Sequence, residues 1–196
     1  MAMEFLRYIV NSMHQSNAYS KNLYQAFEFT KKMGFNPDDA ISGLGINKAY
    51  ANKLVNELTL NLGEVIDTLA RVTRDPVLAF AAECGNVHFH VLKFIQCYYP
   101  DLNANLTVGD FEFDGVALCG FNQQKAKEWL IKKPQKLGCH VWITLGDDVI
   151  LDCTGISYIQ VCTQDSRSIG DVLFGQSNYL GKYPIRHQLY SEGALS

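Results

Sequence analysis

The sequence has no long hydrophobic run, no excess of charge of one sign and no closely spaced cysteines. None of its apolar stretches approaches the roughly 20 residues that a membrane-spanning helix needs. The formal net charge is −3, so the chain lacks the overall basic field that attracts nucleic acid or an anionic membrane. Hydrophobic residues make up 47% and charged residues 19% of the 196 residues, which fits a globular core and excludes a disordered chain. We therefore expect a folded chain with neither a membrane nor nucleic acid as its partner.

Cysteine usage and the first residues of the chain indicate the cellular compartment of the protein. The segment from Met1 to Phe5 has neither a basic leader nor a long apolar stretch, so we expect no signal peptide and a cytoplasmic protein. Export by a leaderless route would leave the same pattern. In such a chain scattered cysteines are expected to be reduced thiols rather than a disulfide framework. The six are Cys84, Cys97, Cys119, Cys139, Cys153 and Cys162.

The first part of the chain, residues 1–78, has the pattern of a helical N-terminal region. Apolar residues recur at helical spacing over 5–13, and a second stretch after Ser20 reaches a natural stop at Gly34. Asn36 and Pro37 suit the start of another helix, because asparagine caps and proline fits the first turn. Further helices are predicted over 48–60 and 62–72.

The second part, residues 79–196, has the pattern of a domain with both helices and strands. The two parts are either separate regions, divided after residue 78, or one compact unit. An apolar helix is predicted over 81–99, where Pro100 disfavours continuation. Short strands near 111–118, a helix over 123–131 and loops in the tail complete the second part. The clearest β signal is a hairpin whose strands, 139–145 and 149–154, flank Gly146-Asp147-Asp148. The predicted fold class is α+β, with a helix packed on an antiparallel sheet.

Cys84 has the local setting of a reactive thiol. It lies in Glu83-Cys84-Gly85-Asn86, at or near the start of the long apolar helix. Unpaired backbone N–H groups and the helix dipole favour a thiolate at this position, and the same N–H groups can stabilise an oxyanion. Catalysis would also need a base within hydrogen-bond reach and a third group that orients the base. An inert, buried cysteine is the alternative interpretation.

His140 and Asp152 can supply the base and the orienting group if the hairpin has the right register. With a three-residue loop, Leu145 pairs with Val149 and Trp142 pairs with Asp152. His140 then lies one diagonal step from Asp152 on the same face. A two-residue loop would turn His140 to the opposite face. The prediction therefore requires an odd-numbered loop, and it also places Cys139 and Cys153 on the other face.

These segments resemble the core of the papain-like/transglutaminase-like cysteine enzymes. The resemblance rests on Cys-Gly at a helix start, then His-Val-Trp-Ile-Thr-Leu, a short turn and Val-Ile-Leu-Asp-Cys-Thr-Gly, and it covers roughly residues 80–160. In that superfamily a helix-borne cysteine meets a histidine and an aspartate on neighbouring strands, often as His-Ala-Trp followed by Asp-Pro-Thr. Here Val141 and Cys153 depart from that pattern. The resemblance implies Cys84 as nucleophile, His140 as general base and Asp152 as orienting acid.

The same resemblance implies acyl transfer at a carbonyl, without a cofactor. The expected function is a protease, deamidase or transglutaminase-type enzyme that acts through a thioester on a peptide or protein side-chain amide. Gly85 and Asn86, beside the nucleophile, and Trp142, beside the proposed cleft, are candidates for substrate binding. Trp142 also fits a packing role. The substrate, the acyl acceptor and the oligomeric state stay open at this stage.

Four other interpretations stay open beside this one. A non-catalytic binding module on the same fold would dock a partner through its helical N-terminal region. His88, four residues after Cys84, could replace His140 as the partner of the thiol. A zinc site from Cys84, His88, Cys139 and His140 would lack the usual ligand spacing, so no metal is expected. The segment 41–49 faintly resembles a helix-hairpin-helix turn, the only hint of nucleic-acid binding.

Overall fold

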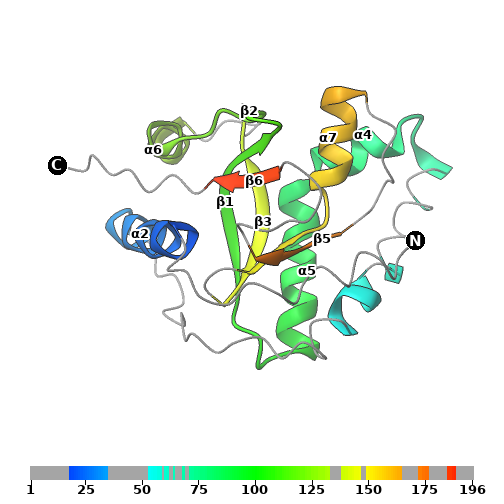
Figure 1. Ribbon diagram of the computed structural model, residues 1–196, viewed down its shortest axis with the longest axis horizontal. Coiled ribbons are helices and arrows are strands. Elements are labelled where there is room, and N and C mark those ends of the chain that lie inside the picture. The colour runs from blue at the N-terminus through cyan, green and yellow to red at the C-terminus, as the bar shows by residue number, and fades with distance from the viewer. Residues whose placement is uncertain are drawn as a thin grey trace.

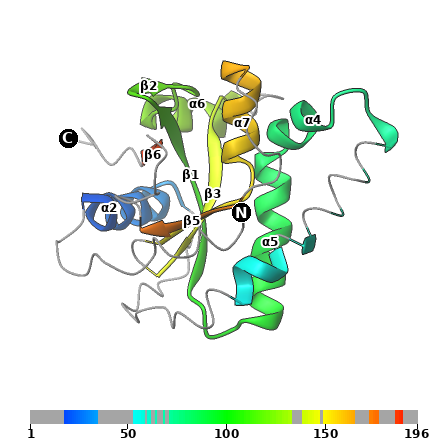
Figure 2. The ribbon, with the colours of Figure 1, turned by 45° about the vertical axis from the view of Figure 1, so that its right-hand side comes forward.

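The computed structural model describes residues 18–34, 53–58, 60–61, 64, 68, 71–132, 138–146, 149–164, 172–176 and 185–188. In these ranges the fold is α+β, as predicted, with an antiparallel sheet flanked by helices (Figures 1 and 2). The strand order is β2-β1-β3-β4-β5, and β6 also pairs with β1. The strands are Ala104–Phe113 (β1), Val116–Ala117 (β2), His140–Leu145 (β3), Val149–Asp152 (β4), Leu173–Gln176 (β5) and Ile185–Gln188 (β6).

The long apolar helix begins at Cys84, and a separate short helix precedes it. The predicted single helix over 81–99 is divided, because one helix ends at Ala82 and the next starts after Glu83. Asp75 begins the short helix by accepting the Leu78 N–H with its side chain. The helices are Ala18–Lys32 (α2), Pro76–Ala82 (α4), Cys84–Tyr98 (α5), Gln123–Lys132 (α6) and Gly155–Thr163 (α7).

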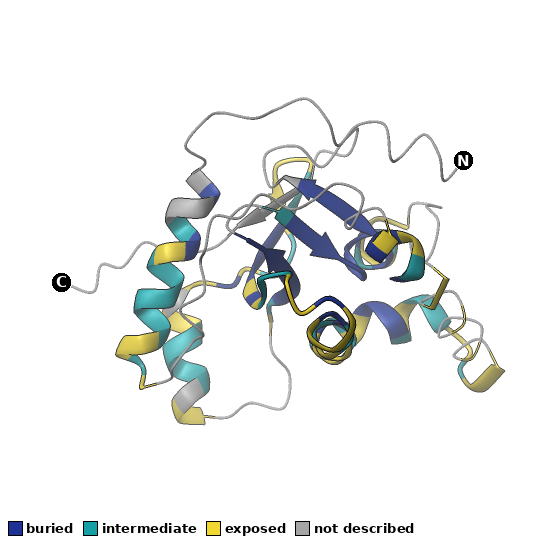
Figure 3. Cartoon of the chain, turned by 90° about the horizontal axis from the view of Figure 1, so that it is seen from below, coloured by how far each residue is buried: buried dark blue, intermediate teal, exposed yellow. Residues whose placement is uncertain are grey.

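The sheet separates two buried clusters of side chains. Because side chains alternate along a strand, odd-numbered residues of β3 and β4 face α5, and even-numbered ones face α2 and α7. Figure 2 shows α5 and α2 on opposite sides of the strands, and Figure 3 shows β3 and β4 buried while α2 and α6 keep exposed outer faces. The first cluster includes Val91, Ile95, Ile143, Leu145 and Leu151, and the second includes Tyr19, Leu23, Trp142, Ile150 and Ile156.

The expectation of loops in the tail is wrong for two segments. Leu173–Gln176 forms β5 and pairs with β4, and Ile185–Gln188 forms β6 and pairs with β1. The helix α7, after the hairpin, is also absent from the predicted elements. Strands of 4 residues are too short to show an alternating pattern, so the serine, glycine and asparagine around them dominate the local signal.

The N-terminal helices are described only in part. The helix predicted after Ser20 is α2, and it ends as predicted near Gly34, whose φ of 86° suits glycine. Residues 53–58 are helical, and Leu54, Val55 and Leu58 belong to the buried cluster on the α5 face. The helices predicted over 5–13 and from Pro37, the turn over 41–49 and most of 62–72 lie outside the described residues. The division at residue 78 stays a prediction. No helix among the residues with described positions has the length and apolarity to cross a bilayer.

Candidate functional site

The hairpin of β3 and β4 has the register that brings His140 and Asp152 together. Leu145 pairs with Val149 across a three-residue loop, as the sequence predicts for an odd-numbered loop. His140 Nε2 lies 2.7 Å from Asp152 Oδ2, and both side chains are fully buried. Cys153 points to the opposite cluster, against α5, which also agrees with the alternation. The site thus begins with a histidine hydrogen-bonded to a carboxylate at one end of the sheet.

Asp152 is held by the start of α7. Its Oδ1 accepts the backbone N–H groups of Thr154 at 2.9 Å and Gly155 at 2.8 Å, where α7 begins. A helix N-terminus stabilises a negative charge through these N–H groups and the helix dipole. Oδ1 therefore accepts hydrogen bonds from the backbone, and Oδ2 points to the imidazole of His140.

Gly155 allows α7 to approach this carboxylate. A Cβ at Gly155 would collide with Asp152 Oδ2 and lie 3.0 Å from Leu173 Cδ1. This residue is not among the site residues predicted from the sequence. Its only signal is the Asp-Cys-Thr-Gly segment, in which a carboxylate precedes a turn that starts a helix.

We expect Gly155→Ala to destabilise the fold and to move Asp152 away from His140. The added methyl group has no room between the carboxylate and Leu173, so a loss of about 1–3 kcal/mol in the free energy of unfolding is expected. Chemical denaturation measures this loss. The control is Gly85→Ala, because a Cβ there meets nothing within 4 Å and alanine favours a helix interior. Equal stability of the two variants would contradict the close approach.

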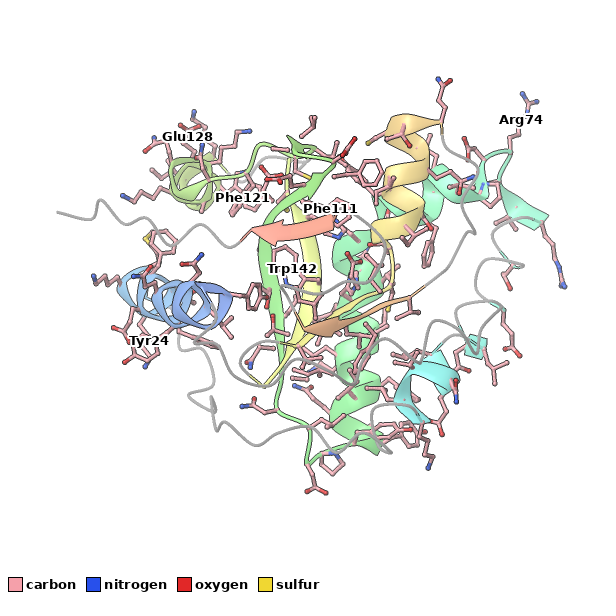
Figure 4. All side chains as sticks on the ribbon, in the orientation of Figure 1. Tyr24, Arg74, Phe111, Phe121, Glu128 and Trp142 are labelled. Atoms are coloured by element: carbon pink, nitrogen blue, oxygen red, sulfur yellow. The ribbon has the colours of Figure 1, made fainter. Side chains whose placement is uncertain are left out.

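His140 is enclosed by rings and interacts with Cys84. The ring centroids of Phe111, Tyr158 and Trp142 lie 4.7, 5.9 and 6.0 Å from that of His140. In Figure 4, Phe111 and Trp142 lie against the strands, whereas Tyr24 and Glu128 point outward from α2 and α6. This burial acts to lower the pKa of His140. The charge and hydrogen bond of Asp152 and the hydrogen bond and charge of the Cys84 thiol outweigh it and raise the pKa from 6.5 to about 10. With this pKa the imidazole is protonated at neutral pH and hydrogen-bonded to the carboxylate of Asp152.

The remaining thiols differ from Cys84 in their surroundings. Burial raises the pKa of Cys119 to about 11 and that of Cys139 to about 12, and it raises the pKa of Cys153 well above its usual value. These thiols are therefore expected to be unreactive at neutral pH. Cys97 and Cys162 are exposed, whereas Cys84 is half-buried at the first position of α5.

The predicted substrate-binding residues lie in different surroundings. Trp142 is fully buried, and its Nε1–H donates to the Tyr19 hydroxyl at 2.7 Å, a position that favours the packing interpretation. Gly85 is half-buried with open space beside it. Asn86 is exposed and donates from Nδ2 to Glu83 Oε2. A role of these three residues in substrate binding stays a prediction.

His88, the competing partner for the thiol, is directed elsewhere. Its Nδ1 lies 2.7 Å from the carbonyl oxygen of Cys84, and its Nε2 lies 2.9 Å from the Cys153 nitrogen. Both ring nitrogens of His88 therefore bond to the backbone, and neither is directed at the Cys84 sulfur. Among the side chains that the structure describes, no three of His, Cys, Asp or Glu gather as metal ligands.

The structure defines an α+β protein in which the helix that begins at Cys84 packs on an antiparallel sheet carrying a buried histidine–aspartate pair. No protein-family model matches the chain, no curated protein matches it, and no solved structure matches its fold. Its function is therefore argued from the geometry of the site.

Proposed function

We propose that the chain is a cysteine-dependent amide hydrolase or acyltransferase with a papain-like/transglutaminase-like core. Cys84 acts as the nucleophile, His140 as the general acid and base, and Asp152 as the group that orients His140. The observation that carries the proposal is the buried hydrogen bond of 2.7 Å between His140 and Asp152, with the Cys84 thiol among the groups that raise the pKa of His140.

The arrangement suits thioester chemistry. The Cys84 thiolate attacks the carbonyl carbon of an amide, and backbone N–H groups at the start of α5 stabilise the oxyanion. The amide C–N bond then breaks, and His140 gives its proton to the departing amine. In the second half, His140 takes a proton from water or from an amine, which attacks the thioester and releases Cys84.

The substrate is proposed to be a peptide or a protein side-chain amide. Hydrolysis of a peptide bond, deamidation of glutamine and amide exchange share these steps and differ in the acyl acceptor. Gly85 and Asn86 adjoin Cys84 at the outer side of α5 and are proposed to contact the acyl group. Asn86 is exposed and Gly85 has open space beside it, which leaves room for a substrate chain next to these two residues.

The first test is the alkylation rate of each cysteine in the full chain. At about pH 6.5 an ordinary thiol is only about 1% thiolate, so we expect iodoacetamide to modify Cys84 about tenfold or more faster than Cys97. Cys97 is the internal reference, because it is exposed and lies on the same helix. Peptide mass spectrometry after short reaction times gives both rates. Equal rates would contradict the proposal.

A second measurement detects the acyl intermediate. p-Nitrophenyl acetate should acetylate Cys84, with a burst of nitrophenolate that is lost in Cys84→Ala and kept in Cys97→Ala. If iodoacetamide does not modify Cys84 faster than Cys97, and p-nitrophenyl acetate does not acetylate Cys84, the fold instead serves as a non-catalytic binding module.

A further inference from the structure

His88, on α5, lies against the end of β4. It is fully buried, one turn after Cys84 on the same helix. Its Nδ1 lies 2.7 Å from the Cys84 carbonyl oxygen, and its Nε2 lies 2.9 Å from the backbone nitrogen of Cys153, the residue that follows β4. Asp152 Oδ1 is also near, 3.4 Å from Nε2.

These contacts define the protonation state of His88. A carbonyl oxygen can only accept, so Nδ1 carries the hydrogen. A backbone N–H can only donate, so Nε2 is the bare nitrogen that accepts from Cys153. His88 is therefore a neutral imidazole with its hydrogen on Nδ1. The contact with Asp152 Oδ1 is then not an ion pair, because neither atom carries a hydrogen.

The two histidines thus have opposite chemistry around one carboxylate. Their ring centroids are 6.3 Å apart and the rings are nearly perpendicular. His140 is charged and bonded to Asp152 Oδ2, and the Cys84 thiol is among the groups that raise its pKa. His88 is neutral and bonded only to backbone atoms, one belonging to the nucleophile residue and the other to the residue after Asp152.

We infer that His88 is a positioning residue that ties the start of α5 to the end of β4 and so sets the distance between the Cys84 sulfur and the His140 imidazole. This inference rests on the proposed function. The first turn of a helix has unpaired N–H groups and depends on other contacts for its position. Cys84 is the first residue of α5, and the side chain of its N-cap residue, Glu83, makes no capping hydrogen bond to a backbone N–H of the helix. His88 supplies a contact there that reaches the strand carrying Asp152.

Two substitutions separate the two ends of this connection. In His88→Asn the amide nitrogen takes the place of Nδ1, which keeps the bond to Cys84 and removes the bond to Cys153. In His88→Gln the amide oxygen takes the place of Nε2, which keeps the bond to Cys153 and removes the bond to Cys84. The matched control is His90→Gln, on the same helix at an exposed position.

Each His88 variant is expected to lower the ratio of the Cys84 to the Cys97 alkylation rate about tenfold, the effect of losing one buried hydrogen bond. His90→Gln should leave the ratio unchanged. The measurement is made well below the melting temperature of each variant, which circular dichroism reports. A residue that only supports the fold would lower the melting temperature and leave the ratio as it is. Suppose that Cys84 is alkylated faster than Cys97 in the wild type and that this ratio is unchanged in both His88 variants. This result would overturn the inference, but it would not contradict the proposed function.

Nitrogen NMR tests the inference independently of catalysis. ¹⁵N shifts of the wild-type protein at neutral pH should show a neutral His88 with its hydrogen on Nδ1. The titration midpoint of His140 should fall in both His88 variants, because the Cys84 thiol is one of the groups that raise its pKa. If Cys84 is no faster than Cys97, the proposed function fails while these shifts still decide the role of His88. A His88 that carries its hydrogen on Nε2 or is doubly protonated, or an unmoved His140 midpoint, would overturn the inference.

Discussion

Asp152→Asn is expected to lower the alkylation rate of Cys84 at about pH 6.5 about tenfold or more, to the rate of an ordinary exposed thiol such as Cys97. The substitution is nearly isosteric, so the packing around Asp152 stays the same. The change falls on the charge and on the hydrogen bond to His140, which are the two largest causes that raise the pKa of His140. Without them, burial lowers that pKa and the cation beside the sulfur is lost.

The tautomer of His140 changes as well. The backbone N–H groups of Thr154 and Gly155 require an acceptor at the position of Oδ1, so the oxygen of the introduced amide takes that position. The amide nitrogen then faces His140 Nε2 and donates to it. The imidazole is forced to carry its hydrogen on the other nitrogen, Nδ1. A histidine in this state cannot take a proton from the thiol, so we also expect turnover to fall about 10²–10⁴-fold.

Asp110→Asn is the matched control for burial of the new amide. Asp110 is also fully buried and its Oδ1 accepts two backbone N–H groups, from Phe111 at 2.7 Å and Cys119 at 3.0 Å. Rates of both variants are measured relative to Cys97, with circular dichroism to show that each is folded. A Cys84 rate that is the same in Asp152→Asn and in the wild type would exclude the carboxylate from the reactivity of the thiol.

The hairpin could be predicted because local rules determine it completely. The alternation of side chains has a period of two, and Gly146-Asp147-Asp148 gives an odd loop, so the faces of His140 and Asp152 follow by counting. The same counting places Trp142 on the face of His140. The burial of Trp142 could not be predicted from this alternation, because it depends on α2. The Tyr19 hydroxyl of α2, 123 positions away in the sequence, accepts the indole N–H.

Two features that sequence reasoning missed, the strand β5 and the close approach at Gly155, depend on contacts between distant segments. The pairing of Asp152 with Leu173 joins β4 to a strand too short to be recognised locally. The same contact explains Gly155, since Leu173 and Asp152 together fill the space that its side chain would need. The position of Cys84 at a helix start was predictable, but the approach of that helix to the end of the hairpin comes from packing of α5 on the sheet.

The protonation of His140 makes stability depend on pH. Its folded pKa of about 10 lies above the unfolded value of 6.5, so the native state holds a proton that the unfolded chain has released. The stabilisation is fully present below about pH 6.5 and is lost as the pH rises to about 10. We expect the difference in free energy of unfolding between wild type and His140→Gln to fall by up to about 1.4 kcal/mol per pH unit in this window. Urea denaturation at closely spaced pH values measures it. Cys119 and Cys139, whose pKa values are also raised, contribute to both proteins and cancel in the difference. A difference that stays flat up to about pH 10 would contradict the charged state of His140 itself.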